Sequence, residues 1–164
     1  SGPVFFLVGV ANESGFAERW ITVPAGKALF FPVLNVEWDY VGAYGDPLPV
    51  GKLRAFAGKI VDGAEDLHAS IDRQDIQNLE SYRVKSPVFA YWVPAEDNMY
   101  QFWGLEVPGA AWPFQTISPA VSDGFWLMVA PLKMGEHTIN FGGSFPDWGF
   151  TLNVTYHITV APGG

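Results

Sequence analysis

Hydrophobic and polar residues alternate through much of this chain. In the segment 150–160 every second residue is apolar, and the residues between them are Thr, Asn or His. A period of two is typical of a β-strand with one buried and one wet face. The segment 125–130 is apolar at every position, which favours a central strand covered on both faces. We therefore expect 125–160 to form three strands joined by two turns.

The same patterns predict further strands at 4–10, 18–23, 28–40, 67–72 and 82–93. Apolar residues recur at spacings of three and four in the segment 50–67, which predicts an amphipathic helix. Gly58 and Gly63 weaken this helix by about 1 kcal/mol each relative to Ala, so it depends on packing. Many strands, one helix and no alternation of strands with helices predict an antiparallel β-sandwich, cupredoxin-like or jelly-roll-like, with one inserted helix at about 50–67. The length of 164 residues predicts a single domain, 1–164.

Composition excludes several classes of function. The net charge is −8 and only 9 of the residues are Lys or Arg, whereas a nucleic-acid-binding protein needs a basic surface. The chain has no Cys, which removes disulfides, thiolate nucleophiles and zinc–thiolate sites. No uncharged run reaches the roughly 18 apolar residues of a membrane-spanning helix. We therefore expect neither nucleic-acid binding nor membrane insertion.

Two parts of the chain resemble known families. The segment 19–27, Arg-Trp-Ile-Thr-Val-Pro-Ala-Gly-Lys, followed by Leu-Phe-Phe at 29–31, resembles the opening of cupredoxin-like sandwiches. This resemblance implies the topology of the fold. It does not imply a blue-copper site, because such a site needs a Cys ligand and the chain has none. The segments 123–128, 130–132, 135–143 and 154–160 are similar to the closing third of a group of uncharacterised exported bacterial β-sandwich proteins. That resemblance implies an exported bacterial protein, secreted or periplasmic after loss of a signal peptide, and implies no chemistry.

The most concentrated polar cluster lies at the end of the predicted strand 28–40. Glu37 and Asp39 share one face of that strand, roughly 6.6 Å apart. This spacing suits the acid and base of a glycosidase-like enzyme, and with Asn35 it would also suit calcium. A strand that simply ends in solvent gives the same pattern. We predict no cofactor, because calcium has no further support.

Histidines do not predict a metal site. If a hairpin turn lies within 142–149, His137 and His157 point to opposite faces of the sheet and cannot share an ion.

Aromatic residues supply the other candidate site. They make up 16% of the chain, and several Trp residues stand beside Gly or Pro, where loops expose them. We predict ligand contacts at these positions: Trp38, Tyr100, Trp103, Trp112 and Trp148. Alternatively, these rings pack on their own loops and contact no ligand.

The sequence thus favours an exported β-sandwich that binds a carbohydrate or an apolar small molecule through loop aromatics. A hydrolase or lyase that uses Glu37 and Asp39 is the first alternative. A structural or assembly domain, whose aromatics are buried in a homo-oligomer, is the second. The sequence leaves open whether the protein is an enzyme and which ligand it binds.

Overall fold

The computed structural model describes residues 2–10, 14–39, 48–105 and 114–163. It is mainly β, with two sheets and two α-helices, and this confirms the predicted β-sandwich with an inserted helix. The elements, in chain order, are β1 (Val4–Phe6), β2 (Phe16–Pro24), β3 (Ala28–Asp39), α1 (Val50–Asp62), β4 (Glu65–Ile71), β5 (Gln74–Asp75), η1 (Leu79–Tyr82), β6 (Arg83–Lys85), β7 (Phe89–Pro94), α2 (Met99–Phe102), β8 (Phe114–Val129), β9 (Gly135–Phe145), η2 (Pro146–Trp148) and β10 (Phe150–Ala161).

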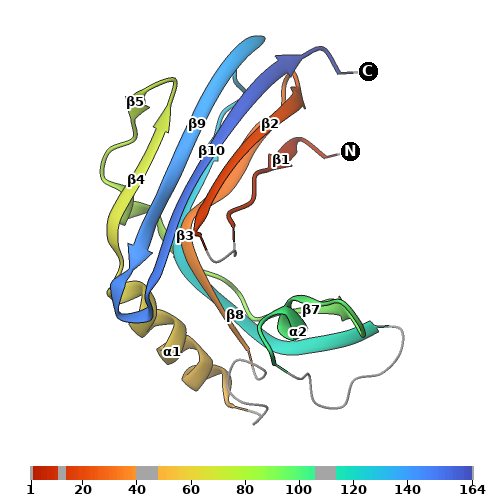
Figure 1. Cartoon of the computed structure of the whole chain (residues 1–164), viewed down its shortest axis with the longest axis vertical. Helices are drawn as coiled ribbons and strands as arrows, with labels where there is room; N and C mark the ends of the chain where they lie inside the picture. Colours follow the sequence, from red (N-terminus) through yellow and green to blue (C-terminus); the bar gives the residue numbers. More distant parts are fainter. Residues whose placement is uncertain (1, 11–13, 40–47, 106–113, 164) are drawn as a thin grey trace. The chain divides into compact units, whose positions relative to one another are not determined.

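The strands form two sheets. Sheet A has the order β1-β3-β8-β6, with β7 paired to β8, and sheet B has the order β2-β10-β9-β4-β5. The pairs β9–β10, β4–β9, β4–β5 and β7–β8 are antiparallel. Two pairs, β1–β3 and β2–β10, are parallel. Figure 1 shows β2, β10, β9 and β4 side by side in sheet B.

The closing hairpin follows the sequence pattern. Strands β9 and β10 pair from Phe145 and Phe150 next to the turn out to Gly135 and Val160. Inward residues of β10 are buried and outward ones are partly exposed, in strict alternation. Because the alternation is local, this hairpin could be predicted without knowledge of the rest of the fold.

Aromatic rings join the two sheets of the sandwich. Phe31 on β3 stacks on Phe141 of β9, with ring centroids 4.7 Å apart, and both side chains are fully buried. Tyr156 on β10 continues this stack at 6.2 Å from Phe141. The inward face of sheet B is thus committed to the core.

Several expected elements are shorter than the sequence suggested. The helix ends at Asp62 instead of 67, because Gly63 favours a turn, closed by a hydrogen bond from Ala64 N to Val61 O, and β4 starts at Glu65. The strand expected at 82–93 is divided into β6 and β7. Pro87 lies in the interruption and cannot donate a ladder hydrogen bond.

The strand around Phe125 is buried on one face only. Its residue Met128 is exposed and Trp126 is half-buried, so the prediction of a strand covered on both faces was wrong. Trp126 stacks on Phe30 of the neighbouring strand at 5.3 Å, and Phe30 meets Phe6 edge-on at 5.9 Å. Apolar composition alone did not distinguish buried rings from this partly exposed row.

The described residues form two compact units. Unit 1 comprises 1–35, 61–84 and 124–164, and unit 2 comprises 36–60 and 85–123. The strands β3 and β8 and the helix α1 each contribute residues to both units. The single-domain prediction stays a prediction, and the two units are described separately below.

Candidate functional site

The acidic end of β3 lies in unit 2 and meets two tyrosines. Asp39 is buried, and its Oδ2 accepts a hydrogen bond from Tyr91 Oη at 2.8 Å. Tyr100 Oη donates to the same oxygen, and the two tyrosine hydroxyls contact each other. The Glu37 carboxyl is near enough to Asp39 for Asp39 to raise its pKa. Glu37, Asp39, Tyr91 and Tyr100 are called the acid–tyrosine cluster below.

Local sequence explains why Tyr100 reaches this cluster. It lies on α2, a helix of only four residues that begins with a capping box at Asn98 and Gln101. Asn98 Oδ1 accepts from the backbone N–H of Tyr100 at 2.9 Å, and Gln101 Oε1 accepts from Asn98 N at 3.2 Å. These bonds satisfy N–H groups that the first helical turn leaves open. The cap therefore fixes the direction in which Tyr100 enters the core.

Electrostatics keeps a proton on the cluster. Burial, together with the charge of Asp39, raises the pKa of Glu37 from 4.5 to about 8. Burial also raises the pKa values of Tyr91 and Tyr100, and the hydrogen bond of each tyrosine to Asp39 raises them further. At neutral pH Glu37 is therefore a carboxylic acid beside the Asp39 carboxyl, which is the arrangement that a proton donor requires.

Glu37 and Asp39 are near enough for Asp39 to raise the pKa of Glu37. Retaining glycosidases hold their carboxyls about 5 Å apart and inverting ones at least about 6.5 Å apart. The glycosidase-like role of Glu37 and Asp39 stays a prediction.

The predicted aromatic contacts are divided between the two units. Trp38 is half-buried, stacks on Phe56 at 6.0 Å and packs against the buried residues of α1, and Tyr100 is buried. Trp103 and Trp148 are exposed, but they belong to different units, and Trp112 lies outside the described residues. Trp103 shares one side of α2 with Met99 and Phe102 because they are spaced by three and four residues.

A second candidate site lies in unit 1, on the outer face of sheet B. The strand register places its outward residues in rows across the strands. One row contains Trp20, His157 and Thr138, the next Glu18, Thr155, Asn140 and Ser70, and the next Phe16, Asn153, Gly142 and His68. Together with Thr22, Thr159 and Glu136 these residues are called the polar face.

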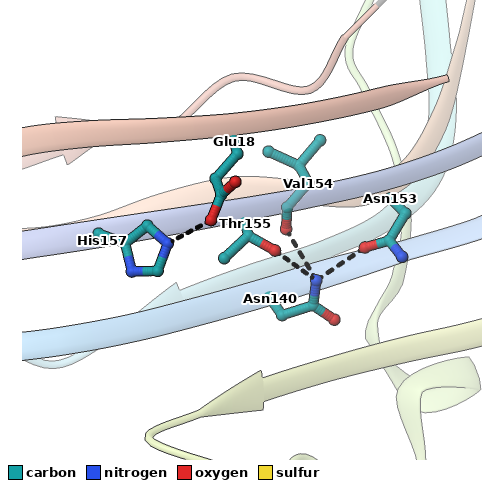
Figure 2. Close-up of polar contacts among 6 residues, drawn as sticks. All are labelled: Glu18, Asn140, Asn153, Val154, Thr155 and His157. Carbon is teal, nitrogen blue, oxygen red and sulfur yellow. Dashed lines mark hydrogen bonds and ion pairs between the residues drawn. The ribbon is translucent and has the colours of Figure 1, made fainter. Parts of the chain in front are cut away.

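Trp20 is the largest side chain on the polar face and is 70% exposed. Its ring lies nearly parallel to the imidazole of His157, with centroids 4.9 Å apart and an interplanar angle of 18°. His157 Nε2 is 2.7 Å from Glu18 Oε1, and Figure 2 shows this contact. Because the carboxylate accepts, Nε2 carries a proton and the imidazole plane is fixed. The exposed indole thus stacks on an imidazole that is itself oriented by Glu18.

An amide network continues the polar face beside this stack. Asn140 Nδ2 approaches Asn153 Oδ1 at 2.7 Å, Thr155 Oγ1 at 3.0 Å and the backbone oxygen of Val154 at 3.2 Å. Figure 2 shows the three contacts converging on this one nitrogen. They fix the orientation of the Asn140 amide.

The sequence predicted the part of the polar face that lies on β10 but not the part on β2. The alternation in β10 predicted a wet row of Thr, Asn and His, but β2 was expected to be an ordinary strand. Its exposed Trp20 and Phe16 become part of a site only through the parallel register with β10. The signal available in the sequence was a run of β2 in which apolar residues fall on the same side as Glu18.

Each of the three histidines contacts different partners. His137 and His157 have opposite sides in the β9–β10 register, as expected from a hairpin. His137 contacts Asp72 and the backbone of Lys133, and His68 Nδ1 contacts the backbone oxygen of Asp66. Within the described ranges, no group of three or more His, Asp or Glu side chains is arranged to hold a metal ion.

Two open clefts occur in unit 1. One, of about 330 Å³, contains the Asp62–Arg83 ion pair and is lined by both acidic and apolar residues, and the other, of about 320 Å³, lies between β4 and η1. Neither is lined by Glu37, Asp39 or a tryptophan.

In the part of the chain that the structure describes, no helix is long and apolar enough to cross a membrane.

Comparisons with known proteins add little. No protein-family model and no curated protein matches the chain. A solved structure, the solution structure of Amebosin, aligns over 96% of this chain and 100% of its own length, with 10% identity and a TM-score of 0.25. A similarity at that level supports neither a fold nor a function.

Proposed function

We propose that this chain is a carbohydrate-binding β-sandwich and that the polar face is its binding surface. One observation carries the proposal: the exposed indole of Trp20 is stacked on His157, which is itself oriented by Glu18. A flat aromatic ring offers an apolar surface to the C–H face of a sugar ring. An indole that is already fixed loses little side-chain entropy when it binds.

The rest of the polar face suits the same ligand. Its other side chains are mainly Thr, Asn and Ser, which offer neutral hydrogen-bond donors and acceptors to sugar hydroxyls. No residue of β2 or β10 lines either described cleft, and of the polar face only His68 does. This open arrangement suits a sugar chain better than a small apolar molecule that needs a pocket.

The proposal is tested by calorimetric titration of the protein with a panel of soluble glycans. Trp20→Ala should weaken binding at least tenfold, which corresponds to about 1.4 kcal/mol. Trp92→Ala is the matched control, because Trp92 is also on a strand and is 76% exposed but lies in unit 2. If the panel gives no heat with wild-type protein, or if Trp20→Ala binds like wild type, the proposal is wrong.

The loop aromatics are tested in the same titration. Trp103→Ala and Trp148→Ala should retain wild-type affinity if the polar face is the site. Loss of binding in either variant, with Trp20→Ala unaffected, would move the site to the loops, as the sequence suggested. Tyr100 is not among the proposed contacts because its side chain is buried.

A second candidate, a hydrolase or lyase, is favoured by one feature of the acid–tyrosine cluster. Glu37 Oε1 is buried and has no hydrogen-bond partner among the described residues, while its carboxyl holds a proton near neutral pH. A carboxyl whose pKa is raised by burial and by a neighbouring acid is a candidate proton donor. Ester and glycoside cleavage should then be lost in Glu37→Gln; no cleavage by wild-type protein, or equal cleavage by the variant, would exclude this function.

We also propose that the protein acts outside the cytoplasm of a bacterium, secreted or periplasmic. The resemblance of its closing third to exported proteins supports this. Cell fractionation of the native host tests it, and a purely cytoplasmic pool would contradict it.

An assembly role without a ligand is the third proposal. Light scattering that shows a stable oligomer, together with glycan titrations that give no heat, would favour it.

A further inference from the structure

We infer that the polar face recognises a neutral, linear oligosaccharide that lies along β2 and β10 and contacts Phe16 as well as Trp20. This inference rests on the proposed carbohydrate-binding function and adds the length and charge of the ligand.

The spacing of two exposed rings sets the length. Phe16 and Trp20 lie on the same side of β2, and Phe16 is 58% exposed. They are four residues apart, which places their Cα atoms roughly 13 Å apart along the strand. One pyranose ring is much shorter than this distance. A ligand that touches both rings must therefore contain several sugar units.

Polar groups between the two rings fit a sugar chain. Asn153 is opposite Phe16 in the register, and Thr155 is opposite Glu18. The Asn140 amide nitrogen is occupied by the contacts described above, so Asn140 Oδ1 and Asn153 Nδ2 have no hydrogen bond to the described residues. Figure 2 shows both atoms on the outer ends of their amides, directed away from the dashed contacts.

This pair offers one acceptor and one donor side by side. Adjacent hydroxyls of a sugar ring each donate and accept, so they can satisfy both atoms at once. The amides would gain two hydrogen bonds without breaking the contacts that orient them. Asn153 is opposite Phe16, so these hydrogen bonds would form next to the second stacking ring. The Phe16 end of the polar face would then give the ligand both an apolar and a polar contact.

Charge selects a neutral ligand. In the described part of the polar face the ionisable residues, apart from histidine, are the acids Glu18 and Glu136, and no Lys or Arg is present. Arg19 points to the opposite side of β2, where it donates to Val8 O and Gly9 O and to Tyr156 Oη. A polyuronate or sulfated glycan would meet carboxylates without a compensating cation.

The experiment is a calorimetric titration with graded series of cello-, xylo- and manno-oligosaccharides, from one to six sugar units, and with oligogalacturonides of the same lengths. For at least one neutral series we expect affinity to rise tenfold or more between one and four units. Phe16→Ala should remove that gain and leave the affinity for the disaccharide unchanged, whereas Trp20→Ala should weaken every member. Trp92→Ala should match wild type throughout.

The variants must remain folded for this comparison. Phe16 is on the wet side of an edge strand, so its removal leaves the core intact, and far-UV circular dichroism checks this. If Phe16→Ala does not fold, Phe16→Thr places a β-branched residue, which favours strands, at this position and serves in its place.

The outcomes separate this inference from the function on which it rests. Affinity that does not depend on ligand length, or tighter binding of oligogalacturonides than of the neutral series, overturns the inference and leaves carbohydrate binding in place. Equal binding by wild type and the Phe16 variant at every length also overturns it. Absence of binding to every glycan overturns both.

Discussion

Replacing Glu37 by Gln should change how the stability of unit 2 depends on pH. Glu37 has a pKa of about 8 in the folded protein against an ordinary value of 4.5. The folded state therefore holds a proton that the unfolded chain releases between these values. Because the folded pKa is raised, the stabilisation is fully present below pH 4.5 and is lost as the pH rises through about 8.

The magnitude follows from the same two values. At about 1.4 kcal/mol per pH unit, the interval from 4.5 to about 8 corresponds to a loss of about 5 kcal/mol. This is an upper limit, because the Glu37 side chain is only half-buried and water screens part of the interaction. Gln has nearly the same shape and can donate to Asp39, but it does not titrate.

The assay is urea unfolding, followed by tryptophan fluorescence, at pH values from 4.5 to 8.5. The difference in unfolding free energy between wild type and Glu37→Gln should shift steadily in favour of the variant, by several kcal/mol over this range. Glu96→Gln is the control, because Glu96 is an exposed carboxyl in the same unit. If the wild-type and Glu37→Gln curves run parallel, the proton assigned to Glu37 is elsewhere and the reasoning fails.

Two further predictions concern buried polar contacts. Tyr100→Phe should destabilise the protein by about 1–3 kcal/mol in the same urea assay, because it removes a hydroxyl that donates to buried Asp39; a loss no larger than that of the exposed Tyr82→Phe would contradict it. His137 contacts Asp72 Oδ2 at 2.8 Å and the backbone oxygen of Lys133 at 2.9 Å, so both ring nitrogens must donate and the ring is a cation. The Asp72 hydrogen bond raises the pKa of His137, so its stabilisation is complete below about 6.5 and is lost as the pH passes the raised value; an NMR titration that places this pKa below 6.5 would refute the assignment.

The sequence was sufficient for features that depend on neighbouring residues. The alternation in 150–160 predicted β10, and the stripe of apolar residues predicted α1. The position of Glu37 and Asp39 on one face of β3 followed from the period of two. Each of these is a local property, so no knowledge of distant partners was needed.

The rest depends on contacts between distant segments. The residues next to Asp39 in the sequence do not predict its hydrogen bonds to Tyr91 and Tyr100, which come from β7 and α2. Trp20 likewise acquires His157 as a neighbour only because β2 pairs in parallel with the last strand. Gly and Pro neighbours drew attention to Trp103 and Trp148, whereas the exposed ring that stacks on an oriented histidine is Trp20, which lies within a strand. Register between distant strands is set by the assembled core, which a single sequence does not display.

The most direct test of carbohydrate binding at the polar face is an NMR titration that follows the indole N–H signals. The chain has 7 tryptophans, and single Trp→Phe variants assign their signals. On addition of a neutral oligosaccharide that binds, the Trp20 signal should shift progressively and saturate, while those of Trp92, Trp103 and Trp148 stay in place. A saturable shift at Trp103 or Trp148 with an unmoved Trp20 signal would contradict the central claim.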